Sequence, residues 1–155
     1  MRLRLLAVGT RVPDWVSAGF QDYARRLPPQ WGFSLKEIPA SKRRPPDPAR
    51  CKADEGARLL AALTTPARVI ALDERGRAWR TEDLALRLEA WLQSGQDVAF
   101  MIGGPDGLAP VCLERADERW SLSALTLPHA LVRVIVAEQL YRASTMLRNH
   151  PYHRR

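Results

Sequence analysis

Two pairs of side chains near the end of the chain could carry proton-transfer or anion-stabilising chemistry. His129 and Arg133 are four residues apart, which puts them on one face of a helix, and Glu138 and Arg142 repeat the spacing on roughly the opposite face. An imidazole exchanges protons near neutral pH, and a guanidinium stabilises a nearby anion. These four residues and His153 are therefore candidate catalytic groups. A structural ion pair explains Glu138 and Arg142 at least as well, and His129 could simply cap a loop.

The terminal residues Tyr152, His153 and Arg154 combine an aromatic ring, an imidazole and a guanidinium. Such side chains stack on unpaired bases and hydrogen-bond to them, so we predict that this tail contacts RNA. His150 and His153 also form an H-x-x-H pattern. Two further ligands are missing nearby in the sequence, so we expect no metal site.

The hydrophobic pattern indicates the elements that would position these groups. Strands are expected at 2–8, 33–38, 68–72, 97–102 and 120–123, and helices at 14–26, 52–63, 81–91, 109–116 and 128–147. Asp14 is a possible cap of the first helix, and the Thr-x-Asp start at Thr81 offers caps to the third. The alternation predicts an α/β fold with a mostly parallel sheet covered by helices on both faces.

Three segments leave the expected carboxyl edge of that sheet, where ligands gather in open α/β folds. They are residues 71–76, 102–107 and 121–129. In the second, Gly103 and Gly104 would let the backbone approach a ligand closely, although their spacing matches neither a dinucleotide fingerprint nor a P-loop. The third is apolar and carries little charge, so we expect it to be buried, with backbone groups free to bind an adenine edge.

The expected helix at 128–147 is apolar around most of its circumference, which predicts that its own sheet covers one side and a partner subunit the other. The segment 40–50 instead carries three prolines and four basic residues without periodicity, which indicates an exposed loop. That loop could contact phosphate, but a solvated loop is the favoured interpretation.

Composition limits the remaining possibilities. The 155 residues are 46% hydrophobic, which suits a single domain over 1–155. A net charge of +7 is compatible with a polyanionic partner such as RNA, or with solubility alone. No apolar run reaches the roughly 18 residues that span a bilayer, and no signal peptide is evident, so we expect a cytoplasmic protein without membrane contact. Cys51 and Cys112 are too far apart to indicate a disulfide framework or a zinc ribbon.

Several strings together resemble the RlmH family of the SPOUT superfamily. They are LAVGT at 6–10, PDW at 13–15, IGGPDGL at 102–108, LSALTLPH at 122–129, VRV at 132–134, AEQLYR at 137–142 and NHPYHR at 149–154. The resemblance covers essentially the whole chain, and these motifs in this order are highly specific. The proline-rich stretch at 45–48 is the clearest suspected departure.

The resemblance implies a homodimer whose C-terminal half forms a trefoil knot, with S-adenosylmethionine as methyl donor. It places the donor among the three strand-exit loops, at Leu72, Asp73, Gly103, Gly104, Ser123, Ala124, Leu125, Thr126, Leu127 and Pro128. The implied reaction is methylation at N3 of a pseudouridine in the helix 69 loop of large-subunit ribosomal RNA, without a metal. The alternatives are a non-catalytic ribosome-binding factor with the same fold and a SPOUT methyltransferase that acts on tRNA.

Overall fold

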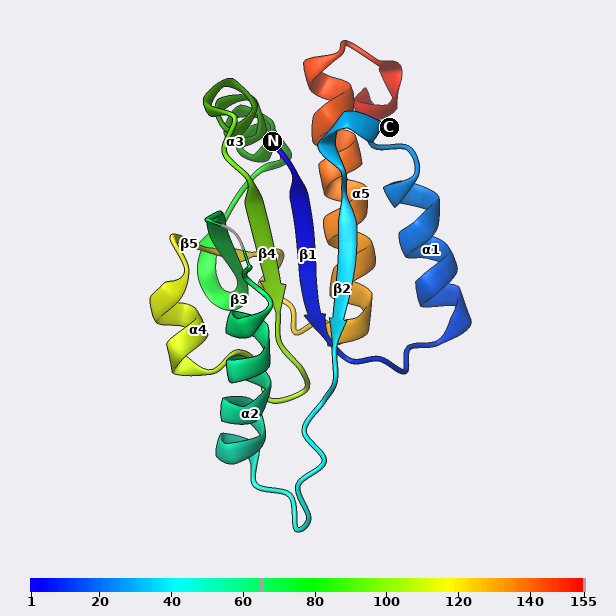
Figure 1. Ribbon diagram of the computed structural model, residues 1–155. Helices are drawn as coiled ribbons and strands as arrows, with labels where there is room; N and C mark the ends of the chain where they lie inside the picture. Colours follow the sequence, from blue (N-terminus) through cyan, green and yellow to red (C-terminus); the bar gives the residue numbers. More distant parts are fainter. Residues whose placement is uncertain (65, 155) are drawn as a thin grey trace.

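A parallel β-sheet forms the centre of the computed structural model, which describes residues 1–64 and 66–154. The sheet has five strands in the order β2-β1-β4-β3-β5, and each neighbouring pair is parallel. The strands are β1 (Leu3–Val8), β2 (Ser34–Ile38), β3 (Arg68–Ala78), β4 (Val98–Ile102) and β5 (Glu118–Ser121). The predicted mostly parallel sheet is thus confirmed, and the carboxyl ends of all five strands lie at one edge (Figure 1).

Helices cover both faces of the sheet, as predicted (Figure 1). One face carries α1 (Asp14–Ala24), α3 (Thr81–Ser94) and α5 (His129–Leu147), and α5 packs against both of the others. The opposite face carries α2 (Pro48–Ala61) and α4 (Pro110–Arg115), which pack on each other. Two short 3-10 helices, η1 (Pro29–Trp31) and η2 (Pro151–Arg154), complete the described elements.

Alternating residues of the central strands supply two separate hydrophobic cores, because successive side chains of a strand point to opposite faces. Leu5 and Phe100 belong to the core beneath α1, α3 and α5. Their neighbours Leu6 and Met101 belong to the core beneath α2 and α4. All four side chains are fully or almost fully buried, so the sheet is apolar on both faces, as the continuous apolar runs indicated.

Two helix starts differ from the sequence expectations. The N-cap of α1 is Pro13, without a side-chain hydrogen bond, and Asp14 lies inside the first turn. The predicted Asp14 cap is therefore wrong, although its charge still favours the positive end of the helix dipole. The second helix begins earlier than expected, at Pro48, because Asp47 accepts a hydrogen bond from the Arg50 amide and caps it. The end of the expected loop at 40–50 is thus helical.

The strand expected at 68–72 is longer, and it contains an irregularity. Leu72 and Arg77 both pair with Trp120 of β5, so the residues between them leave the regular ladder. The first expected strand-exit loop is therefore an irregular, multi-residue bulge within β3. Sequence patterning missed the return to the sheet because Arg77 and Ala78 carry no alternating apolar signal.

Helix α5 lies between α1 and α3 against the sheet, and none of the residues 131–147 is exposed. Neighbours within the chain thus cover much of its apolar circumference. The partner subunit remains a prediction. In the described part of the chain, no helix is both long enough and apolar enough to span a membrane.

Candidate functional site

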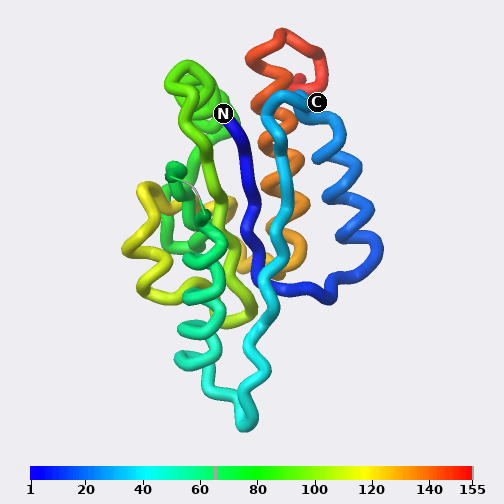
Figure 2. The backbone as a smooth tube through the Cα atoms, in the orientation of Figure 1, coloured from blue at the N-terminus to red at the C-terminus, as the bar shows by residue number. Residues whose placement is uncertain are grey.

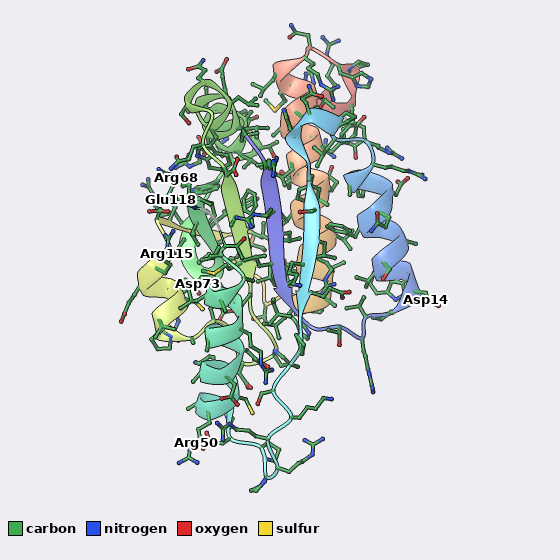
Figure 3. All side chains as sticks on the ribbon, in the orientation of Figure 1. Asp14, Arg50, Arg68, Asp73, Arg115 and Glu118 are labelled. Atoms are coloured by element: carbon green, nitrogen blue, oxygen red, sulfur yellow. The ribbon has the colours of Figure 1, made fainter. Side chains whose placement is uncertain are left out.

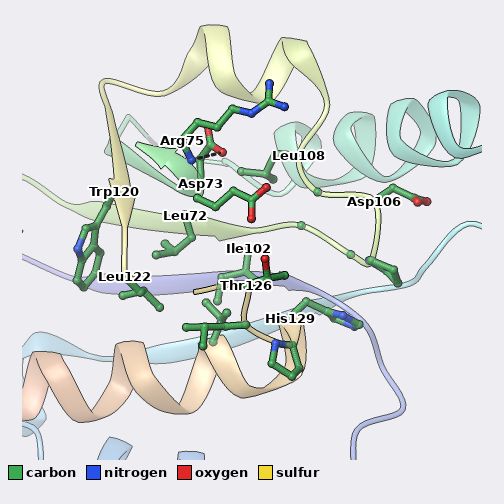
Figure 4. A pocket seen from close by; sticks show the side chains of 18 of the residues that line it. Leu72, Asp73, Arg75, Ile102, Asp106, Leu108, Trp120, Leu122, Thr126 and His129 are labelled. Atoms are coloured by element: carbon green, nitrogen blue, oxygen red, sulfur yellow. Dashed lines mark hydrogen bonds between the residues drawn. The ribbon is translucent and has the colours of Figure 1, made fainter. Parts of the chain in front are cut away.

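A cavity of about 560 Å³ opens at the carboxyl edge of the sheet, beside the ends of β3, β4 and β5 (Figure 4). Its size lies within the range of small-molecule sites. Apolar side chains that line it include Leu72, Ile102, Leu108, Leu122 and Val132. Charged side chains that line it include Asp73, Glu74, Asp106, Lys52, Arg75 and Arg119. The cavity can therefore accept a ligand that has an apolar part and charges of both signs.

The structure brings the three predicted strand exits together around this cavity. Of the residues predicted to hold a methyl donor, nine line it: Leu72, Asp73, Gly103, Gly104, Ser123, Leu125, Thr126, Leu127 and Pro128. Ala124 does not line the cavity, and its side chain is exposed. The apolar walls formed by Ile102, Leu122 and Val132 were not among the predicted site residues. Ile102 and Leu122 lie within two of the predicted exits and Val132 follows the third, so their positions could have indicated them.

The segment after β5 was expected to be buried, and in the single chain this is wrong. Leu125 is 72% exposed, and Ala124, Thr126 and Pro128 are exposed as well. The segment closes on itself instead, since the Ser123 hydroxyl accepts a hydrogen bond from the Leu125 amide at 3.0 Å. The segment still lines the cavity, through Ser123, Leu125, Thr126, Leu127 and Pro128.

The two glycines after β4 have different reasons for lacking a side chain. A Cβ at Gly103 would come within 2.5 Å of the Gly107 carbonyl, because the chain turns back tightly between Gly104 and Gly107. A Cβ at Gly104 would meet Val8 and the Glu55 carboxylate at 3.1 Å. The protein itself therefore requires glycine at both positions. Both residues line the cavity, and a close approach of a ligand to their backbone stays a prediction.

The bulge in β3 carries its polar residues to the opposite wall of the cavity. The Asp73 carboxylate accepts a hydrogen bond from the Arg75 amide at 3.1 Å, which fixes the turn (Figure 4). A Cβ at Gly76 would lie 2.6 Å from the Arg119 backbone, so only glycine lets the bulge pack against β5. The bulge thus holds Asp73, Glu74 and Arg75 at the cavity.

His129, at the start of α5, is the catalytic candidate that lines the cavity (Figure 4). Burial lowers its pKa from 6.5, the nearby Arg133 lowers it further, and Glu55 opposes both effects. Its imidazole is therefore mainly neutral at pH 7, and a neutral imidazole can accept a proton. That state is the one required of a general base.

Arg133 lies behind His129 and is only 1% exposed. Its guanidinium donates to the Glu37 carboxylate at 2.9 Å and to the Gly9 carbonyl at 3.2 Å, which joins α5 to the ends of β2 and β1. Arg133 does not line the cavity. Its contacts are those of a structural ion pair, and sequence reasoning missed Glu37 because a single acidic residue in an edge strand resembles any solvated charge.

Glu55 of α2 is a second group that sequence reasoning missed. It is 5% exposed, and one carboxylate oxygen accepts a hydrogen bond from the Ser41 amide at 3.0 Å. The other oxygen, Oε1, has no partner among the described residues and lies beside Gly104. The available signal was its position four residues before Leu59, on the apolar face of the helix.

The other catalytic candidates form a network farther along α5. Glu138 and Arg142 form an ion pair at 2.6 Å, and the Tyr152 hydroxyl donates to Glu138 at 3.2 Å. The Tyr152 ring packs on Tyr141 with ring centres 4.6 Å apart. Burial raises the pKa of Tyr152 well above its usual range, and Tyr23 and Glu138 add to this effect, so its phenol stays protonated. These contacts support the interpretation of Glu138 and Arg142 as a structural ion pair.

The two sets of candidates do not meet within one chain. A helix rises about 1.5 Å per residue, so Glu138 and Arg142 lie roughly 14 and 20 Å along the axis from His129. Figure 2 shows the C-terminal segment at the opposite end of the molecule from the loop that follows β2. His153 is half-buried and Arg154 exposed there. The described residues contain no group of three His, Cys, Asp or Glu side chains that could hold a metal.

Comparison with known proteins identifies the class. The model of a family described as "Predicted SPOUT methyltransferase" matches residues 1–153. The chain therefore belongs to the SPOUT methyltransferases. Solved structures of a probable methylase family protein from Haemophilus influenzae and a probable methyltransferase from Bordetella pertussis share this fold. Their TM-scores are 0.59 and 0.58, each is 16% identical, and they cover 97% and 92% of this chain, which covers 69% and 95% of theirs.

Curated relatives narrow the class. Proteins named "Ribosomal RNA large subunit methyltransferase H" from Nitrosococcus oceani and Methylococcus capsulatus are 56% and 54% identical to the chain over 155 residues. Each alignment covers 99% of this chain, and 99% and 100% of the respective relative. The resemblance to the RlmH family is thus confirmed.

Proposed function

We propose that the protein transfers a methyl group from S-adenosylmethionine to large-subunit ribosomal RNA, at N3 of a pseudouridine in the helix 69 loop. The cavity among the three strand exits is the observation that carries this proposal, because it gathers nine of the ten residues that the family resemblance implies for the donor. The substrate is supported by near-full-length relatives named as ribosomal RNA large-subunit methyltransferases. Such a substrate would place the protein with ribosomes in the cytoplasm.

The cavity has the chemistry that this donor requires. Its apolar walls at Leu72, Ile102 and Leu122 suit an adenine ring, and the carboxylates of Asp73, Glu74 and Asp106 suit positive charge. Lys52 and Arg75 suit the donor's carboxylate. The bound donor would supply an electrophilic methyl group on a sulfonium ion. The loops would hold it and keep bulk water from the reacting atoms.

The acceptor nitrogen must lose its proton as it is methylated, and His129 is the proposed proton acceptor. It lines the cavity, and the lowering of its pKa keeps the imidazole in the form that can accept a proton. Cationic side chains near the base would stabilise the anionic ring. Arg142 and Arg154 are the candidates for that role.

A homodimer would bring the two separated sets of residues together. We propose that one subunit supplies the cavity and its partner supplies Tyr152, His153 and Arg154 to the same RNA base, since roughly 20 Å or more separates them within one chain. The exposed Leu125, beside the cavity, would then lie in or near the interface. Family membership supports the accompanying trefoil knot in a single domain over 1–155. Sedimentation at micromolar concentration should give a dimer, and a monomer would contradict this proposal.

The function is tested by methylation of ribosomes that lack the modification. Purified protein and labelled S-adenosylmethionine are incubated with ribosomes, free large subunits, protein-free ribosomal RNA or tRNA, and mass spectrometry locates the methyl group. We expect methylpseudouridine in the helix 69 loop of ribosomes or large subunits. Methyl transfer to tRNA alone would show that tRNA, and not ribosomal RNA, is the substrate. Donor binding without transfer to any RNA would contradict the enzymatic proposal, and absence of donor binding would favour a non-catalytic factor.

A further inference from the structure

The loop between β2 and α2, residues 39–47, projects past the carboxyl edge of the sheet, and we refer to it as the basic finger (Figure 1). Lys42, Arg43 and Arg44 are exposed on it, as are Pro45 and Pro46. A flexible loop can carry exposed charges simply because water solvates them. Solvation does not explain why the base of this loop is fixed by hydrogen bonds to the rest of the chain.

Neighbouring acids of α2 hold the base of the basic finger. Glu55 accepts from the Ser41 amide at 3.0 Å, and Asp54 accepts from the Ser41 hydroxyl at the same distance. Asp54 also accepts from two nitrogens of Arg43, at 2.7 and 2.9 Å. These hydrogen bonds lower the pKa of Asp54, with Arg43 as the largest cause, so the carboxylate stays ionised at neutral pH. One further bond joins Arg58 to the Pro39 carbonyl at 2.7 Å.

The anchoring leaves part of the positive charge unpaired. Arg43 is engaged by Asp54, and Arg50 lies 3.6 Å from Asp47. Lys42 and Arg44 have no hydrogen bond or ion pair with any residue in the described part of the chain. A fixed loop with free cations loses little conformational entropy when an anion binds, which favours binding over a flexible loop of equal charge.

The basic finger stands next to the cavity. Helix α2 runs from its end into the cavity wall, where Lys52 lines the lumen, and Glu55 lies against Gly104 of the strand-exit loop. In Figure 3, Arg50 lies at the end of α2 beyond Asp73, whereas Arg68 and Glu118 lie toward the other edge of the sheet. An RNA whose base enters the cavity therefore passes near the finger.

We propose that the basic finger binds RNA phosphates beside the target nucleotide through Lys42 and Arg44. This inference rests on the proposed function for the identity of the RNA, and it assigns a role to a loop that neither the donor cavity nor the C-terminal tail explains. Each phosphate contact that a cation makes releases counterions, so it steepens the fall of RNA affinity with salt.

The test compares Lys42→Gln/Arg44→Gln with the matched control Lys36→Gln/Arg77→Gln. Each double variant removes one exposed lysine and one exposed arginine that have no hydrogen bond or ion pair from their side chains in the described part of the chain, and neither control residue lines the cavity. Affinity for ribosomes and for protein-free large-subunit RNA is measured over a series of salt concentrations. Donor affinity and the maximal methylation rate are measured in parallel.

For the finger variant, we expect weaker binding to both RNAs and a slope of log affinity against log salt that is shallower by about 0.7 to 0.9 per lost contact. Donor affinity and the maximal rate at saturating ribosomes should stay at the wild-type values. An unchanged slope, or an equal change in the control, would overturn the proposal. A change on ribosomes but not on protein-free RNA would also overturn it, in favour of a ribosomal protein. Failure of the proposed function can be told apart from failure of this proposal. In the first case the wild-type protein methylates no ribosomal RNA, whatever the salt dependence of its RNA binding.

Discussion

The two ends of α5 are built on different principles. At the His129 end, the helix begins beside an open cavity whose far walls are loops, and the imidazole forms no ion pair with any described residue. At the other end, Tyr152 of the tail packs on Tyr141 and donates to Glu138, which also pairs with Arg142. The His129 end therefore borders an open cavity, whereas the other end is packed with side chains.

This difference separates the consequences of substitution. Residues that line a preformed cavity contribute little to folding, so changing them should alter ligand affinity while the protein remains folded. Residues of a packed polar network contribute to folding, and to RNA contact as well if the tail acts there. The following experiments test that separation, beginning with the largest expected effect.

Removal of residues 152–155 should reduce methyl transfer by about 100-fold or more, because misplacement of the target base alone can cost that factor. Donor affinity should stay within twofold of wild type, since none of residues 152–154, the part of the tail that the structure describes, lines the cavity. Single-turnover methylation and calorimetric titration measure the two quantities. Parallel losses of donor affinity and melting temperature would mean that the tail acts on the fold.

Mixed dimers test which subunit's tail serves each cavity. A truncated subunit is combined with a full-length subunit that carries Gly103→Ala, so cavity and tail are intact only on different chains. If the tail acts across the dimer, the mixture regains up to half the wild-type activity per dimer, because one of the two sites is complete. Activity is measured at a donor concentration well below the dissociation constant of the Gly103→Ala cavity, where that parent is nearly inactive. A mixture no more active than the average of its two parents would show that the tail serves its own chain.

Replacing Glu37 by Gln should lower the free energy of unfolding by about 2 kcal/mol, because it leaves the charge of buried Arg133 without its carboxylate. Glu37 is 37% exposed, so water compensates for part of the loss. Chemical denaturation measures this change. The exposed Lys36→Gln on the same strand is the control, and an equal loss there would contradict a specific role for the ion pair.

Substitution Gly103→Ala should weaken S-adenosylmethionine binding by about tenfold, since a Cβ at 2.5 Å from Gly107 forces the loop to move. Calorimetric titration of the folded variant provides the measurement. Gly95→Ala is the control for a general loss of stability, because alanine is unfavourable at its positive φ of 67° but no atom lies within 4 Å of the added Cβ. Unchanged donor affinity in the Gly103 variant would remove this loop from the donor site.

The smallest effect concerns protonation of His129. Its folded pKa is below 6.5, so its contribution to stability is fully present above pH 6.5 and is lost as the pH falls through the folded value. His129→Asn should therefore lose less stability than wild type between pH 7 and pH 5, by a few tenths of a kcal/mol to about 1 kcal/mol. Denaturation at both pH values measures this, with the exposed His150→Asn as control.

The sequence alone predicted the sheet, because hydrophobic periodicity and apolar runs mark strands such as β4. It also predicted that the three loops after the strands lie together, because the carboxyl ends of parallel strands share one edge of the sheet. It missed contacts between distant elements. Nothing near Arg133 in sequence indicates that Glu37 pairs with it, and nothing near Glu55 indicates that Gly104 lies against it. The exposure of Leu125 was also missed, because an apolar segment is ambiguous until the edge of the sheet is placed.

The bulge in β3 has a consequence for how the cavity could diversify. Since Leu72 and Arg77 both pair with Trp120, the ladder resumes where it stopped, and the sheet sets no length for the four residues between them. An insertion or deletion at 73–75 would leave every other strand pairing in register while it changes one wall of the cavity. Gly76 must stay, because it is the residue that passes the Arg119 backbone. This short segment is therefore a natural place for evolution, or for a designer's loop library, to change ligand preference at little cost to folding.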